Sequence, residues 1–528
     1  MLLKHFKRAS LSIGIALALA GTASAETVLR VGNMGEPATL DPHHVAGTWE
    51  NRIIGDMFLG LTTEGPDGSV VPGAAESWTI SDDGLTYTFQ LRDHSWSDGT
   101  PVTADDFVFA LRRILSPEIA AKYASLLYPI KNAEEINNGS VADASVLGAR
   151  AIDDKTLEIT LVAPTPYFIE QLTHYTAFPV PKHLVEAHGD DWIKKDNIAS
   201  NGPYVLDEWV PNTHVRLVKN IDFYDASNVS IETVEFFPSE DRGAVQKRFR
   251  SGEIDIAKDF ASEQFDFLKK NLPDETRVAP YLGIYYYPVN TNKPPFDDKR
   301  VRQALSMAID RSAITDKVLK TGEVPAYSFV PPGTGNYGDP AFVSWMETPY
   351  KERVEAAKAL LTEAGYGPDN PLKFTLSYNT SENHKRIAIA VAAMWKQLGV
   401  QAELFNQEVT PHYNKLEQND FDVARAGWIA DYNDAQNFLY LLETRTGRQN
   451  YGRYSNAEFD DYMAKAANTT DMDKRAQYLR SAEAIAMEDQ PVIPIYYYVS
   501  KNLVSNSVAG WEPNVKDIQR TRYLSIKP

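Results

Sequence analysis

Alternation of apolar and polar residues predicts several short β-strands. In the stretch 85–92, LTYTFQLR, every second residue is apolar or aromatic, and the stretches 156–162 and 372–380 repeat this period of two. Because successive side chains of a strand point to opposite faces, the pattern is typical of strands that cover a core with one face. The region 70–100 has the character of an antiparallel hairpin.

Apolar residues at helical spacing predict helices between these strands. One helix begins at Thr103, and Asp106 three residues later comes close to completing a capping box. A second helix is predicted over 297–319, where acidic residues at the start are followed by apolar residues at helical spacing.

A third predicted helix, 382–400, lies between two strands. Gly399 is expected to end this helix, because glycine readily adopts the left-handed conformation, and 401–407 follows as a strand. The succession of strand, helix and strand over 372–406 indicates a βαβ unit with parallel strands. The chain is therefore predicted to be a mixed α/β protein with several lobes.

The first 25 residues have the features of a secretory signal peptide. Basic residues precede the apolar run LSIGIALALAG, which is too short to cross a bilayer, and ASA at 23–25 forms a cleavage site of small residues. Cleavage before Glu26 leaves 503 residues (528 − 25), enough for roughly three domains of ~150 residues. The chain contains no cysteine, so we expect neither a lipid anchor nor a disulfide.

Charge and composition narrow the class of partner. The formal net charge of −18 becomes −21 when the three basic residues of the signal peptide are removed, which argues against nucleic acids and anionic membrane surfaces as partners. Aromatic residues make up 11% of the sequence and include 27 tyrosines, which suit either binding clefts or ordinary half-buried positions.

No motif for catalysis, a cofactor or a metal stands out. GTGNYG at 333–338 has the spacing of a dinucleotide loop, but its surroundings indicate an ordinary loop rather than a strand-to-helix turn. His43 and His44 are adjacent, yet no further ligands follow at metal-site spacing. The sequence has no Gly-x-Ser-x-Gly, His-Glu-x-x-His or Walker motif. We therefore expect a protein that is not an enzyme and that uses neither a cofactor nor a metal.

The stretch 422–434, DVARAGWIADYND, places a carboxylate against an apolar surface. Asp431 follows a run that is small and apolar apart from Trp428. Because burial of an unpaired charge is costly, two interpretations are open. Asp431 binds a cation, or it caps a turn or helix at the residues that follow it.

An ordered set of segments resembles the oligopeptide-binding proteins of bacterial peptide ABC transporters. They run from about residue 30 to the C-terminus and include LDPHHVAG, WSDGTPVTADDFVFALRRI, FRSGEIDIA, PYLGIYYYPVNTNKPPFDDKRVRQALSMAIDR, DVARAGWIADYNDAQNFL and PVIPIYYYVSKNLV. Each segment alone is weak, but the set in this order is specific. It implies a two-lobed periplasmic binding protein fold, type II-like and of cluster C, with an additional third domain.

The resemblance also implies domain boundaries. Lobe I takes 26–58, 182–282 and 500–528, the additional domain takes 59–181, and lobe II takes 283–499. Ligand is expected to be trapped between the two lobes by hinge closure.

By the same resemblance, Asp431 pairs with the free α-amino group of a bound peptide. Backbone groups of Ala426, Gly427 and Ile429 are expected to pair with the peptide backbone, as an added strand does. Trp428 either walls the cleft or packs in the core. Arg425 is expected to meet a peptide carboxylate or, as the competing interpretation, to join the two lobes by a salt bridge.

Further positions correspond to residues that line the cleft in this family. They are Tyr123, Tyr286, Tyr498, His174, His384 and Asn379. For each histidine an ordinary surface or capping role is equally compatible with the sequence. His384 is expected to approach the C-terminal end of the peptide.

The chain also departs from the family pattern. Residues that carry charge in relatives correspond here to Ala46, Pro288, Leu319 and Leu416. A cleft with fewer charges is expected to favour apolar side chains or a narrower set of ligands.

The predicted function is a soluble periplasmic receptor, a monomer, that binds short peptides and delivers them to the transmembrane subunits of an ABC permease. A murein-peptide receptor is the alternative within the family, because its ligand also has a free amine. A secreted hydrolase is the alternative from another class, and a chaperone-like or adhesive role is a third.

Overall fold

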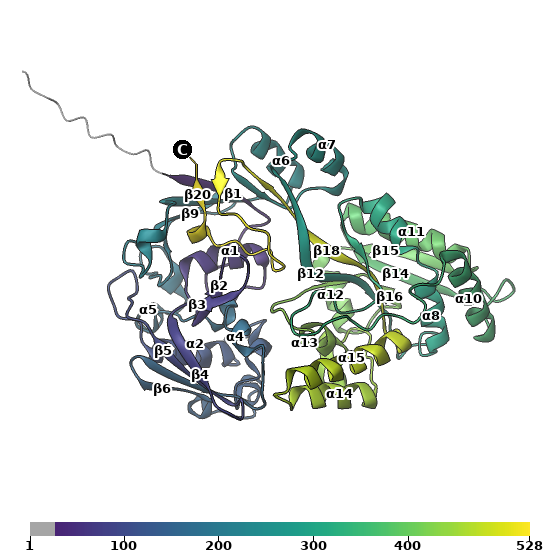
Figure 1. Cartoon of the computed structure of the whole chain (residues 1–528), viewed down its shortest axis with the longest axis horizontal. Helices are drawn as coiled ribbons and strands as arrows, with labels where there is room; N and C mark the ends of the chain where they lie inside the picture. The colour runs from purple at the N-terminus through teal and green to yellow at the C-terminus, as the bar shows by residue number, and fades with distance from the viewer. Residues whose placement is uncertain (1–26, 528) are drawn as a thin grey trace, which may run out of the picture.

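A sheet of nine strands runs through the middle of the molecule and joins its two sides (Figure 1). The computed structural model describes residues 27–527, so the predicted signal peptide 1–25 lies outside the described residues. In spatial order the sheet contains β17 (Ala426–Ile429), β12 (Thr276–Pro288), β18 (Val492–Val504), β11 (Ile256–Lys258), β1 (Val28–Asn33), β10 (Thr233–Pro238), β9 (His214–Lys219) and β8 (Tyr204–Val210), and β13 (Val324–Pro325) pairs with β18 beside this path.

Two long strands connect the sides. β12 and β18 have 13 residues each and pair antiparallel. Their register shifts between Pro280 and Ile284. Before the shift β12 lies beside the part of β18 that also pairs with β11, and after it β12 lies beside β17. The shift therefore falls where the two sides of the molecule meet.

An antiparallel sheet on the left of Figure 1 confirms the predicted strands at 85–92 and 156–162 and the hairpin character of 70–100. Its order is β4 (Ala75–Ile80), β5 (Thr86–Leu91), β7 (Thr156–Thr160) and β6 (Ala149–Asp153). Tyr87 and Phe89 of β5 point into the core, as the alternation predicts. Helix α2 (Ala104–Leu115) packs on this sheet and begins with the predicted capping box of Thr103 and Asp106.

The predicted βαβ unit is confirmed on the right of Figure 1. β14 (Lys373–Asn379) and β15 (Gln401–Gln407) are parallel neighbours, joined by α11 (Glu382–Lys396), and β16 (Val423–Ala424) pairs with the other edge of β14. The chain leaves α11 through Gly399 at φ +79°, with its N–H donating to the Lys396 carbonyl and the Val400 N–H donating to the Trp395 carbonyl. This pair of bonds is the Schellman arrangement that glycine favours.

The single helix predicted over 297–319 is wrong. The chain forms α8 (Lys299–Met307), a break, α9 (Arg311–Ala313) and a π-helical turn from Ile314 to Leu319. Asp310 in the break is extended, and its carboxylate accepts the Ala313 N–H at 3.0 Å, so it starts a new helix. Arg311 is fully buried and donates to the carbonyl oxygens of Ala326 and Pro494, which fixes the break.

The remaining elements cover these sheets or join them. They are β2 (Thr62–Glu64), β3 (Val70–Pro72), α1 (Thr48–Met57), α3 (Ala133–Asn137), α4 (Phe168–Gln171), α5 (Lys182–His188), α6 (Arg242–Arg250), α7 (Phe265–Asn271), α10 (Tyr350–Glu363), α12 (Val409–Glu417), α13 (Gln436–Leu439), α14 (Ala457–Ala467), α15 (Met472–Asp489), β19 (Val508–Ala509) and β20 (Ser525–Ile526). Among residues 27–527, no helix is both long enough and apolar enough to cross a membrane.

Separate cores hold the two sides. One large cluster of buried apolar residues spans β1, α1, α2 and the small antiparallel sheet, and it includes Leu524 near the C-terminus. Two further clusters fill the other side, one under β14 and α11 and one under α14 and α15. The first cluster is continuous across residue 59, where the sequence predicts a domain boundary, and the boundaries stay a prediction.

The conformation of Gly399 gives a test of the α11 terminus. A Cβ at Gly399 would meet no atom within 4 Å, so Gly399→Ala loses only the positive-φ preference and is expected to lower the free energy of unfolding by about 1–2 kcal/mol. Gly367→Ala is the matched control, because its Cβ also enters open space and its φ is ordinary. Equal stability of the two variants in urea would contradict this account of the helix end.

Candidate ligand-binding site

β17 is the outermost strand of the large sheet, and its far edge pairs with no strand among the described residues. The Ala430 N–H donates to the Leu282 carbonyl at 2.8 Å. In an antiparallel ladder backbone groups turn to the partner strand at every second residue, so those of Trp428 also face β12. The N–H and C=O groups of Gly427 and Ile429 therefore face the free edge.

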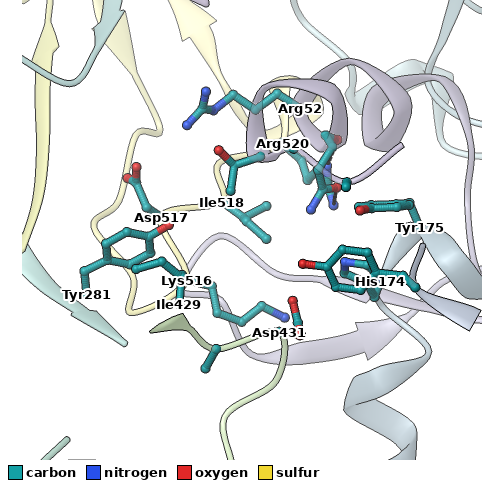
Figure 2. Close-up of a pocket in the computed structure, with 16 residues that line it drawn as sticks. Arg52, His174, Tyr175, Tyr281, Ile429, Asp431, Lys516, Asp517, Ile518 and Arg520 are labelled. Carbon is teal, nitrogen blue, oxygen red and sulfur yellow. Dashed lines mark hydrogen bonds between the residues drawn. The ribbon is translucent and has the colours of Figure 1, made fainter. Parts of the chain in front are cut away.

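A cavity of about 110 Å³ lies at the end of this strand, between the two sides of the molecule (Figure 2). Ile429, Ala430 and Asp431 line it from one side. The opposite walls come from the start of α1, from residues 123 and 174–175, and from the C-terminal segment: Ala46, Gly47, Thr48, Asn51, Arg52, Tyr123, His174, Tyr175, Lys516, Asp517, Ile518 and Arg520, with Tyr281 from β12.

Asp431 presents its carboxylate to this cavity. Asn437 of α13 fixes its backbone, because the Asn437 Oδ1 accepts the Asp431 N–H at 3.2 Å and the Trp428 Nε1–H at 2.8 Å. Burial raises the pKa of Asp431 to about 7, against the opposing effects of the Asn437 amide and the Lys516 charge. Asp431 forms no ion pair with any described residue, so its negative charge is available to a ligand.

Lys516 extends toward Asp431 in Figure 2, but glutamates hold its ammonium. The Lys516 Nζ lies 3.5 Å from Glu64 Oε1 and 3.7 Å from Glu170 Oε1, and it donates to Thr173 Oγ1 at 3.1 Å. Arg520 lies 3.0 Å from the other oxygen of Glu64. These buried pairs balance one another, so Lys516 is not a dedicated counter-ion for Asp431.

Tyr123 and His174 lie on the wall that faces Asp431. The Asp431 carboxylate, followed by burial, raises the pKa of Tyr123, which places the hydroxyl close to that charge. The rings of Tyr123 and His174 are 5.6 Å apart. Burial, together with the Lys516 charge, lowers the pKa of His174 to about 3, so this imidazole is neutral at physiological pH. These two side chains are thus polar but uncharged.

A second cluster surrounds Arg425 at the other end of β17. Its guanidinium donates to Asn379 Oδ1 at 3.1 Å, to Tyr413 Oη at 3.1 Å and to Tyr498 Oη at 2.8 Å, and it lies 4.9 Å from the centre of the Tyr285 ring. All of these partners are neutral, and no described residue forms an ion pair with Arg425. The salt bridge between lobes that the competing interpretation of Arg425 expects is thus not found among the described residues.

The two charges lie along the same extended segment. Asp431 and Arg425 are six residues apart, which corresponds to at most ~20 Å in an extended chain. Gly427 lies between them, and a Cβ there would come within 2.7 Å of Tyr498 Oη and 2.9 Å of Arg425 Nη2. A side chain at position 427 would therefore displace the ends of the Tyr498 and Arg425 side chains.

The remaining predicted residues divide between the cleft and the core. His384 lies beside Tyr285, 5.5 Å between ring centres, and burial, followed by the Arg425 charge, lowers the pKa of His384 to about 2. Ala426 is fully buried, Tyr286 packs its ring on Phe329, and Trp428 packs against the same core. Their side chains belong to the core. The backbone groups of Ala426, like those of Trp428, face β12, so the expected pairing of the Ala426 backbone with a peptide is not supported, in contrast to that of Gly427 and Ile429.

Sequence reasoning missed the C-terminal contribution to the cavity. Lys516, Asp517 and Arg520 occur in the stretch KDIQR, whose charges are typical of a solvated surface. Tyr413 binds Arg425 and Asn437 binds Asp431, but no sequence pattern marks either residue as part of the site. Among the positions where relatives carry a charged residue and this chain does not, Ala46 lines the cavity and Leu416 is buried in a core.

Comparison with known proteins gives a consistent family. The model described as bacterial extracellular solute-binding proteins, family 5 Middle, matches residues 69–450. The chain is 41% identical over 500 residues to the periplasmic oligopeptide-binding protein OppA of Escherichia coli K12, covering 93% of this chain and 91% of OppA. It is also 41% identical over 496 residues to the periplasmic murein peptide-binding protein MppA of that strain, with 93% and 91% covered.

Solved structures agree with this fold. The complex of Haemophilus influenzae OppA with RPPGFSPFR has a TM-score of 0.83 at 37% identity, covering 96% of this chain and 100% of that one. The Escherichia coli murein tripeptide-binding protein MppA has a TM-score of 0.85 at 39% identity, covering 95% and 99%. The expected three-domain α/β binding-protein fold is therefore confirmed. The chain belongs to the family 5 bacterial extracellular solute-binding proteins, which are the substrate-binding components of ABC transporters and not enzymes.

Proposed function

We propose that this protein binds short peptides in extended form between its two sides and delivers them to the permease of an ABC importer. The observation that carries the proposal is the unpaired carboxylate of Asp431 at the end of an open strand edge, facing a cavity between the sides. Its relatives are named as periplasmic proteins, and with the predicted signal peptide this supports a periplasmic receptor.

The amine end of a peptide suits Asp431. An ammonium is the one positive charge that every unmodified peptide carries. A buried carboxylate recovers the cost of its desolvation only when such a partner arrives and makes charge-assisted hydrogen bonds. The alternative interpretation, in which Asp431 caps a turn or helix, has less support, because its carboxylate lines the cavity.

The backbone of the peptide suits the free edge of β17. The N–H and C=O groups of Gly427 and Ile429 face away from β12 and are placed to pair with an added strand. Such pairing ignores side-chain identity, so it supports a receptor for many sequences. Arg425, held only by neutral groups, is placed to receive the carboxylate of a short peptide or an acidic side chain.

Acetylation of the peptide tests the amine anchor. We expect N-acetyl-trialanine to bind on the order of a hundredfold more weakly than trialanine, because acetylation leaves the Asp431 charge buried and unpaired. Asp431→Asn is expected to lose a similar factor for trialanine and to bind both peptides alike. Titration calorimetry measures all four affinities, and equal binding of the two peptides by the wild-type protein would refute the proposal.

The raised pKa of Asp431 predicts a pH dependence of binding. Below about pH 7 the carboxylate of the unliganded protein is mainly protonated, and the ammonium must displace that proton. Affinity for trialanine is therefore expected to fall about tenfold per pH unit below 7, roughly a hundredfold between pH 7 and pH 5. His174 and His384 stay neutral in this range and do not contribute. Calorimetry with Asp431→Asn should show a flat profile, and a flat profile for the wild type would contradict the assignment.

A murein-peptide receptor is the second candidate function, because MppA is as similar to this chain as OppA is. Both classes of ligand have a free amine, so Asp431 does not separate them. Competition between murein tripeptide and trialanine does. A preference for the murein tripeptide of more than tenfold would assign this second function.

A further inference from the structure

The two residues after Asp431 tie the two sides of the molecule together. The Tyr432 ring stacks on Tyr167, with 4.7 Å between ring centres and 7° between planes. The backbone N–H of Asn433 donates to Glu170 Oε1 at 2.9 Å. Tyr167 and Glu170 belong to the segment that carries α4, and Glu170 precedes Asn433 by 263 residues. These contacts cross between the two sides immediately beside the cavity.

Asn433 and Asp434 are also fixed on their own side. Asn433 Oδ1 accepts the Gly335 N–H at 2.8 Å, and a Cβ at Gly335 would come within 2.8 Å of the Asn433 carbonyl. Asp434 accepts two hydrogen bonds from Arg475 at 2.7 and 2.9 Å in a fully buried pair. The loop therefore presents the Asn433 N–H as a rigid donor, and Asp431 moves with it.

Glu170 connects this donor to the cavity wall. The same oxygen that accepts the Asn433 N–H lies 3.7 Å from Lys516 Nζ, and Lys516 lines the cavity that contains Asp431. The Glu170 carboxylate thus contacts both the loop that follows Asp431 and Lys516 of the opposite cavity wall. Its contact with Asn433 exists only when the two sides are together.

We propose that Glu170 is a positioning residue that keeps the ligand enclosed by holding the Asn433 N–H, and with it Asp431, against the opposite wall. The stack of Tyr432 on Tyr167 supports the same contact. The inference rests on the proposed function in one respect, namely that a ligand occupies the cavity while the sides are closed. It does not require that the ligand be held by its amine.

The rate of ligand dissociation tests this role. In Glu170→Ala the dissociation rate of trialanine, followed by stopped-flow tryptophan fluorescence, is expected to rise roughly ten- to hundredfold, the effect of losing a hydrogen bond to a charged acceptor. The association rate should not change, because the contact with Asn433 forms when the two sides close. The pair with Lys516 is lost with or without ligand, so the proposal predicts a larger fall in melting temperature with trialanine bound than without it. Tyr167→Ala should act in the same direction.

Two matched variants serve as controls. Tyr167→Phe keeps the stacked ring and is expected to dissociate like the wild type. Glu158→Gln changes an acid of the antiparallel sheet that, among the described residues, pairs only with the exposed Arg150, and it should also be neutral. A dissociation rate of Glu170→Ala within twofold of wild type, or an equal loss of melting temperature with and without trialanine, would overturn the proposal.

The outcome separates this inference from the amine anchor. Glu170→Ala should weaken trialanine and N-acetyl-trialanine by the same factor, whereas Asp431→Asn should remove the difference between them. Failure of the amine anchor would appear as equal binding of both peptides by the wild-type protein. Failure of the Glu170 role would appear as unchanged dissociation with that difference intact.

Discussion

A buried carboxylate without a counter-ion is the feature on which the site depends. In a medium of low polarity the Asp431 charge has an unfavourable free energy until a cation reaches it, and burial therefore raises the pKa of its carboxyl to about 7. The nearest lysine, Lys516, does not satisfy it, because Glu64 and Glu170 hold its ammonium. The ionic network around Lys516 thereby leaves Asp431 without an ion pair.

The groups that face the ligand cavity and the groups that contact the opposite side of the molecule lie in one short stretch of chain. The strand β17 offers backbone groups at its free edge, Asp431 follows with a charge, and the next residues contact the opposite side. Because these groups are consecutive, a ligand that moves Asp431 also moves the loop that closes against Glu170. The long strands β12 and β18 connect the sides, and their register shift lies between the parts that belong to each side.

The charges at the two ends of β17 are treated differently. Asp431 is unpaired and faces a cavity, whereas Arg425 is surrounded by hydroxyl and amide oxygens that stabilise its charge without neutralising it. Neutral hydrogen-bond partners lower the cost of keeping a cation buried and leave its charge free to attract an anion. The polarity of the site therefore runs from negative to positive along the strand.

The sequence by itself determined the local elements and, through the family resemblance, pointed to Asp431 as the proposed anchor. Period-two alternation located β5, β7 and β14, the capping box located α2, and the order of motifs pointed to Asp431 and Arg425. These signals are local, so they survive without knowledge of the fold. They also failed locally where a tertiary contact intervened, as at Asp310 and the buried Arg311, which divide the helix predicted over 297–319.

Only the tertiary structure decided what surrounds the anchor. Lys516 and Arg520 reach Glu64 from more than 400 positions away in the chain, and Glu170 reaches Asn433 across 263. Neither periodicity nor spacing in the sequence predicts such long-range contacts, because they depend on how distant segments pack together. Likewise, the sequence marks Ala426 and Trp428 as part of the ligand strand, but only the pairing with β12 shows that their side chains enter the core.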